Sequence, residues 1–204
     1  MTLGSVLDEI REVYLSLFRQ AVREACAPKG ARVLPEPSFL TDDGSLAREG
    51  SLGLPSRMDV VVFTGETPEN VSVDSESLLT FDALNFDWKE VPVCVLPFCW
   101  DACPVLLTGL PETPDWSPLK AWFEQWFDLE DARPADKAGL YGVVHFLSDP
   151  VTEDGKTRFH LDLGSAPVTA FEGLLDALVA TGAKRLEFGE LSETEAEAGT
   201  DTEA

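Results

Sequence analysis

Apolar residues recur every three or four positions in the first part of the chain, from residue 6 to residue 27. This period places them on one face of an amphipathic helix. Ser5 is a suitable capping residue before the run, and Pro28 and Gly30 end it. We expect this wide apolar stripe to pack on a sheet. The polar face mixes acidic with basic residues, which is a poor match for a helix lying on anionic lipid.

The following part of the chain alternates between turn-forming segments and short apolar runs. Residues 28–57 are rich in Pro, Gly, Ser and acidic residues, and we predict an irregular loop with at most short strands near residues 32–34. Four further strands are predicted, at residues 59–63, 78–88, 91–98 and 105–107. Pro92 and Pro97 indicate an edge position or bulges for the third of these strands, because proline donates no hydrogen bond to a sheet.

The last part of the chain has the clearest order of elements. A helix is predicted to begin at Ser117-Pro118, and another spans residues 167–181 with Gly182 after its end. Strands are predicted at residues 140–148, 157–163 and 185–188, the first two joined as a hairpin with Asp154-Gly155 as turn residues. The whole pattern predicts an α+β fold, a largely antiparallel sheet packed by the N-terminal amphipathic helix and two further helices.

Length and charge limit the kinds of partner. A chain of 204 residues fits one domain, here residues 1–189, and residues 190–204 form an acidic tail without basic residues that we expect to be disordered. The 37 acidic and 15 basic residues give a formal net charge of −22. This charge argues against direct binding to nucleic acid or to an anionic membrane, since both need cationic contacts. With no membrane-spanning run and no secretory signal, we expect a cytoplasmic protein.

Three of the four cysteines are clustered as Cys94-x4-Cys99-x3-Cys103, and the fourth is Cys26. Structural zinc sites usually use closer cysteine pairs and four ligands, and no histidine is near this cluster. The residues between the cysteines are apolar, which favours buried neutral thiols and no bound metal or cofactor. The spacing alone leaves a metal site open.

The two histidines form a candidate for chemistry. Pairing residue 148 with residue 157 across the predicted hairpin places His145 opposite His160, with Asp162 diagonal to His145. Directly opposed side chains have Cβ atoms about 5 Å apart. Such a group would bind a divalent metal or act as an acid–base pair. A plain half-exposed sheet face is the simpler interpretation, and a slip of one residue would separate the two imidazoles.

Acidic residues are interleaved with tryptophans in the middle of the chain. The residues concerned are Asp82, Asp87, Trp88, Glu90, Trp100, Asp101, Asp115 and Trp116. Aromatic anchors with charged surroundings are typical of tight protein interfaces. Each indole taken singly is explained more simply as part of the core. Together with the net charge of −22, the set predicts a surface for a basic protein partner.

The chain has no dinucleotide-binding glycine motif after a strand, no phosphate-binding loop, no HExxH and no GxSxG. A small, strongly acidic α+β chain without such motifs resembles, in type and composition, the immunity proteins of bacterial toxin–immunity pairs. The resemblance implies a cytoplasmic, non-enzymatic inhibitor that occludes the active site or substrate-binding surface of a basic toxin such as a nuclease. Two alternatives remain: a small enzyme using His145, His160 and Asp162, and an acidic adaptor whose tail carries the function.

Overall fold

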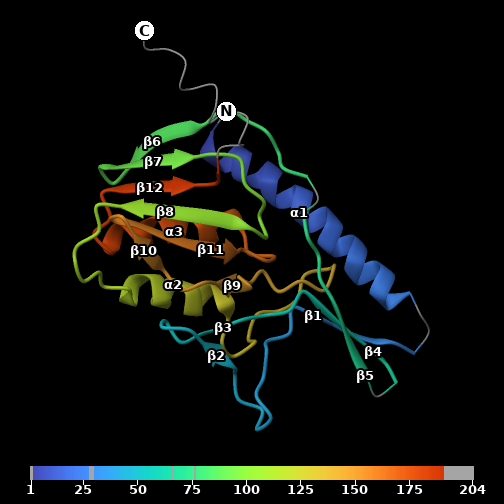
Figure 1. Ribbon diagram of the computed structural model, residues 1–204. Coiled ribbons are helices and arrows are strands. Elements are labelled where there is room, and N and C mark those ends of the chain that lie inside the picture. The colour runs from blue at the N-terminus through green and yellow to red at the C-terminus, as the bar shows by residue number, and fades with distance from the viewer. Residues whose placement is uncertain (1, 28–29, 66, 76, 191–204) are drawn as a thin grey trace.

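The computed structural model describes residues 2–27, 30–65, 67–75 and 77–190 (Figure 1). Within these residues the chain forms three helices: α1 (Leu3–Cys26), α2 (Ser117–Phe127) and α3 (Val168–Ala180). The strands are β1 (Arg32–Pro35), β2 (Arg48–Glu49), β3 (Leu54–Pro55), β4 (Val60–Thr64), β5 (Thr67–Val71), β6 (Leu84–Trp88), β7 (Val91–Val95), β8 (Cys103–Thr108), β9 (Phe146–Leu147), β10 (Val151–Glu153), β11 (Lys156–Asp162) and β12 (Arg185–Phe188).

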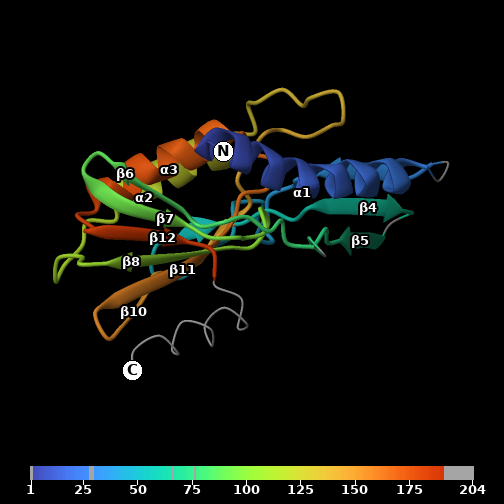
Figure 2. The same ribbon diagram turned by 90° about the horizontal axis from the view of Figure 1, so that it is seen from above.

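The largest layer is a seven-stranded sheet with the order β10-β11-β8-β12-β7-β6, in which β9 also pairs with β11. All of its pairs are antiparallel except β12 with β7. Figure 2 shows α2 and α3 on one face of this sheet. Phe188 of β12 packs there against Phe171 of α3, with ring centroids 4.7 Å apart. The predicted α+β fold with a largely antiparallel sheet is therefore confirmed.

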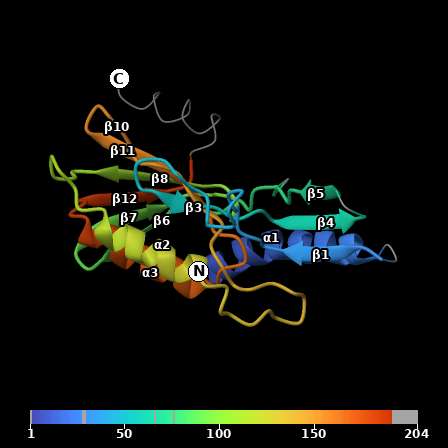
Figure 3. The same ribbon diagram turned by 90° about the horizontal axis from the view of Figure 1, so that it is seen from below.

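The helix α1 connects this layer to a second, smaller sheet. It begins with a capping box in which the Thr2 hydroxyl accepts from the Ser5 N–H, so the cap lies three residues before the predicted one. Residues at three- and four-residue spacing, such as Tyr14 and Phe18, are buried along one side of α1. The helix contacts α3 as well as β1 and β4. Figures 2 and 3 show the three-stranded sheet β1-β4-β5 beside the C-terminal half of α1.

Several strand predictions need correction. The strand β7 is not at an edge, because β12 and β6 pair with its two sides. Pro92 is tolerated because β12 pairs only with Val93–Val95, so the proline faces a single neighbouring strand. The polar segment β5 forms a strand that its composition does not predict. Of the predicted strand 140–148, only residues 146–147 are paired as β9.

The acidic tail predicted for residues 190–204 lies, apart from the exposed Glu190, outside the described residues. In the part of the chain that is described, no helix is both long and apolar enough to span a membrane.

Candidate functional site

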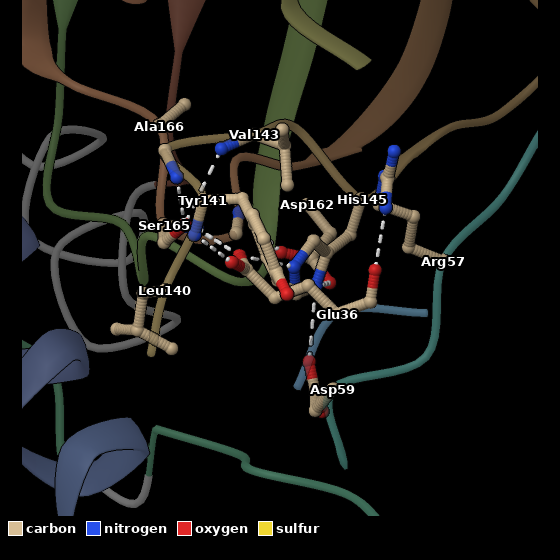
Figure 4. Close-up of polar contacts among 12 residues, drawn as sticks. Glu36, Arg57, Asp59, Leu140, Tyr141, Val143, His145, Asp162, Ser165 and Ala166 are labelled. Atoms are coloured by element: carbon tan, nitrogen blue, oxygen red, sulfur yellow. Dashed lines mark hydrogen bonds and ion pairs between the residues drawn. The ribbon is translucent and has the colours of Figure 1, made fainter. Parts of the chain in front are cut away.

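The most unusual polar feature of the interior is a histidine surrounded by three carboxylates (Figure 4). The residues come from four segments: Glu36 follows β1, Asp59 precedes β4, His145 precedes β9, and Asp162 ends β11. The cluster therefore lies where the small sheet meets the large one.

The backbone fixes the position of His145. Its N–H donates to the Asp162 carbonyl oxygen at 3.0 Å, and its carbonyl oxygen accepts from the Arg57 N–H at 3.0 Å. Phe18 presents a ring nearly perpendicular to the imidazole, with the centroids 5.8 Å apart. Gly164 lies so close to the imidazole that there is no space for a side chain between them. The His145 side chain is fully buried.

Both imidazole nitrogens face carboxylate oxygens. Nε2 lies 2.9 Å from Glu36 Oε1, and Nδ1 lies 3.0 Å from Asp59 Oδ1. Nδ1 also lies 3.5 Å from Asp162 Oδ2. This geometry suits an imidazolium that donates from both nitrogens.

Main-chain donors hold each carboxylate in place. Glu36 is fully buried and accepts from the N–H groups of Tyr141 at 2.6 Å and Ser165 at 3.3 Å. Its φ of 53° is left-handed, a conformation that costs a non-glycine residue roughly 1–3 kcal/mol and that the surrounding structure must enforce. The other two carboxylates each bind one main-chain N–H, from Val73 to Asp59 Oδ2 and from Gly164 to Asp162 Oδ1, both at 2.8 Å.

The electrostatics of the cluster follow from its burial and its charges. Burial alone lowers the pKa of His145, but the carboxylates of Asp162, Asp59 and Glu36 outweigh it and hold the pKa well above 6.5. Burial raises the pKa of Asp162 above 3.8, although the nearby imidazole opposes this shift. Burial and neighbouring carboxylates also raise the pKa of Tyr14, so its hydroxyl stays protonated and donates to Asp59 Oδ1 at 3.2 Å.

Arg57 is the nearest buried cation, but its hydrogen bonds lead away from the cluster carboxylates. Its guanidinium donates to the carbonyl oxygens of Glu36, Phe127 and Asp128 and to the Asp131 carboxylate. It also lies 4.5 Å from the centroid of the Phe127 ring. Arg57 therefore ties α2 to the β1 and β4 region without neutralising the acids around His145.

The predicted pair of His145 and His160 is not formed. In the structure Leu147 pairs with Leu161, a shift of three residues from the predicted register, and His160 is exposed opposite Ser148. The register differs because β10 supplies the strand that forms the tight hairpin with β11. An odd shift moves alternate side chains to the opposite face of a sheet. Of the predicted trio, the structure brings together only His145 and Asp162.

Sequence reasoning missed Glu36 and Asp59, which take the place of His160. They lie 109 and 86 residues from His145 in the chain, so no local spacing connects them. The one local signal is the sequence Pro35-Glu36-Pro37, an acid fixed between two prolines.

The predicted partner residues divide into two groups. The strands β6 and β8 run in the same direction, because β6 is antiparallel to β7, β7 is parallel to β12, and β12 is antiparallel to β8. Asp82 and Asp101, which precede these strands, therefore lie at one end of the sheet. Glu90 and Asp115, which follow them, lie at the other end. A single patch containing all eight residues is not present.

Several of these residues have structural contacts. Trp100 is fully buried beside Phe98 and Phe171, so we remove it from the predicted surface. Asp101 accepts hydrogen bonds from the main-chain N–H and the hydroxyl of Ser75. The Trp88 indole N–H donates to Asp176 at 2.6 Å.

The remaining members of the set are exposed, except Trp116, which is partly buried. Asp115 accepts from the Ser117 N–H at 2.9 Å, and the partly buried Trp116 packs on the core. Asp82, Asp87 and Glu90 are exposed.

The cysteines are all free thiols: Cys94 and Cys103 are buried, Cys99 is partly buried and Cys26 is exposed. Burial raises the pKa of the Cys103 thiol, which keeps it neutral. Among the described residues, the only group of three potential metal ligands that lie close together is Asp59, His145 and Asp162.

Comparison of the chain with protein-family models, with the curated proteins and with the solved structures finds no match. Neither these comparisons nor the fold of the described residues indicates an enzyme family, and we assign no catalytic residue.

Proposed function

We propose that this protein is a cytoplasmic, non-enzymatic inhibitor of the immunity-protein type. It binds a basic protein toxin, such as a nuclease, and occludes the active site or substrate-binding surface of that toxin. The observation that carries the proposal is the large excess of acid, 37 acidic against 15 basic residues. A charge of this size accelerates encounter with a basic protein and repels nucleic acid.

The internal use of basic side chains supports the same proposal. Arg11, Arg57 and Arg133 donate to main-chain carbonyl oxygens within the protein. Four more basic residues pair with acids of the same chain: Arg19, Arg48, Lys89 and Arg185. Seven basic side chains are thus engaged within the chain, and among the described residues most exposed acids form no ion pair with a lysine or arginine.

We centre the contact on β6, which lies at one edge of the large sheet. Within the described residues no strand pairs with its outer side. Asp87 lies on this strand, and Asp82 and Glu90 lie just before and just after it; all three are exposed. Edge strands are commonly protected by lysines, whereas this edge carries acids. An extended basic segment of a partner could form main-chain hydrogen bonds with the edge of β6 and ion pairs with these acids at the same time.

The proposal is tested by immobilising the tagged full chain and exposing it at low salt to a lysate of its native cells. One stoichiometric basic protein is expected, released as the salt concentration rises. That protein is then purified, and the dissociation constant and association rate are measured at several salt concentrations. If the partner is a nuclease, its activity is titrated with the acidic protein and is expected to reach zero at one equivalent.

The site is tested with the triple variant Asp82→Lys, Asp87→Lys, Glu90→Lys. A matched control reverses three exposed acids on other elements, Asp8, Glu9 and Glu69, with the same total change in charge. The β6 variant is expected to bind at least tenfold more weakly than the control and to show a flatter salt dependence.

Equal affinities of the two triple variants would refute the β6 surface. Absence of any basic partner would refute the inhibitor proposal itself. Deleting residues 190–204 is expected to preserve most of the affinity, whereas loss of binding would favour the acidic adaptor.

A further inference from the structure

The carboxylates around His145 outnumber the cationic groups that contact them. With all three ionised and the imidazole protonated, Glu36, Asp59, Asp162 and His145 carry a net charge of −2. The hydrogen bonds of the Arg57 guanidinium go to carbonyl oxygens and to the Asp131 carboxylate. Charges in a protein interior are normally paired or coordinate a metal. The structure thus leaves this largely buried group short of positive charge.

The donor atoms have the separations that a metal ion needs. Nδ1 of His145 lies 3.0 Å from Asp59 Oδ1 and 3.5 Å from Asp162 Oδ2, and each of the three residues offers one donor atom such that these atoms lie within 4.8 Å of one another. With bonds of about 2.0–2.2 Å, the donors of a tetrahedral zinc ion lie roughly 3.3–3.6 Å apart. Two of the three separations therefore already fall near the required value.

The surrounding contacts orient these atoms as ligands. The Nε2 side of the imidazole faces Glu36, which itself accepts from two main-chain N–H groups (Figure 4). A histidine that binds a metal usually donates its other N–H to such a carboxylate. Asp59 and Asp162 each have one oxygen held by a main-chain N–H and the other directed at Nδ1.

We propose that Asp59, His145 and Asp162 bind a divalent transition-metal ion of the zinc class, with Glu36 fixing the imidazole. The ion takes the place of the Nδ1 proton and reduces the net charge of the group from −2 to −1. The mixed nitrogen and oxygen donors suit zinc, and three protein ligands leave the fourth position for water. The Asp59 and Asp162 side chains remain 14% and 24% exposed, which provides a path for the ion from solvent.

The test uses the full-length protein after treatment with a chelator. Zn²⁺ is titrated calorimetrically, and thermal melts are recorded with and without the ion. We expect one ion per chain and a rise in Tm that grows with the free Zn²⁺ concentration. Glu36→Gln is expected to weaken binding roughly 10–100-fold through loss of the orienting carboxylate. Asp59→Asn and Asp162→Asn are expected to weaken it at least as much.

Two controls separate this site from other sources of binding. Asp42→Asn removes an exposed acid outside the cluster, and Cys99→Ser removes a thiol of the clustered cysteines; both are expected to leave the affinity unchanged. Circular dichroism checks that each variant is folded. The visible absorption spectrum of Co²⁺ bound to the wild-type chain is a test that needs no variant. We expect the absorption bands of tetrahedral Co²⁺ and no charge-transfer band from a thiolate ligand.

Absence of stoichiometric binding would overturn the proposal. So would binding that survives Asp59→Asn and Asp162→Asn in folded protein, a loss of binding in Cys99→Ser, or a thiolate band with Co²⁺. None of these outcomes bears on the inhibitor proposal, because the acids near β6 lie outside this cluster.

Discussion

Gly164 is a precise probe of the packing around His145. Its φ is +51°, and a Cβ atom added there would lie 2.5 Å from the Val143 carbonyl oxygen and 2.6 Å from Nε2 of His145. Neither neighbour is free to move, because one is backbone and the other is held between carboxylates. We therefore expect Gly164→Ala to destabilise the protein by about 2–5 kcal/mol. The left-handed conformation accounts for roughly 1–2 kcal/mol, and overpacking for roughly 1–3 kcal/mol.

The matched control is Gly142→Ala. Gly142 has a φ of +70°, but a Cβ atom there would meet nothing within 4 Å, so only the conformational cost of roughly 1–2 kcal/mol applies. Urea unfolding of the wild type and both variants at one pH gives the two free energies of unfolding. A loss in Gly164→Ala no larger than that in Gly142→Ala would refute the close packing of the imidazole against Gly164.

Three further predictions concern buried polar groups and thiols. In urea unfolding, Arg57→Met is expected to lower the free energy of unfolding by roughly 3–5 kcal/mol, because it leaves buried carbonyl oxygens without donors. Asp131 is the exposed ion-pair partner of Arg57, and Asp131→Asn should cost less than about 1 kcal/mol in the same experiment. In chelator-treated protein, His145 is expected to remain an imidazolium by NMR at pH 7, since its pKa is raised well above 6.5. The stability that this charge contributes is fully present below pH 6.5 and is lost as the pH rises through the pKa of His145 in the folded protein. If the free energies of unfolding of the wild type and His145→Gln differed by the same amount at every pH, the imidazolium would be refuted. A disulfide reagent should modify the exposed Cys26 quickly and the buried, neutral Cys103 only after unfolding, and rapid reaction of both in the native protein would be the contrary result.

The helices follow from local pattern because a helix completes its hydrogen bonds within one segment. The predicted helix over residues 167–181 is α3 to within a residue at each end, and Gly182 adopts the expected positive φ of 90°. The predicted start at Ser117-Pro118 is the start of α2. In α1, Thr2 rather than Ser5 is the cap, because both hydroxyls suit that role and the helix begins one turn earlier.

Strands depend on partners that the sequence does not specify. The prolines of residues 91–98 predict an edge position or bulges, yet β7 lies between β6 and β12, because Pro92 falls outside the short pairing with β12. The polar β5 is a strand only because the outer side of β4 is available to it. Strand pairing also decided the register near His145, and with it the separation from His160.

The sequence by itself determined the helices and the α+β class, because periodicity and helix caps depend on residues that are close together in the chain. It also determined the acidic net charge, because that charge is a sum over the ionisable residues. It also identified His145 and Asp162 as candidates, from their place in the predicted hairpin. Only the tertiary structure brought Glu36 and Asp59 to the imidazole and buried Trp100, since those contacts join segments far apart in the chain. The charge of the buried cluster is likewise a tertiary property, because the same acids spread along an unfolded chain would be solvated and would not need a cation.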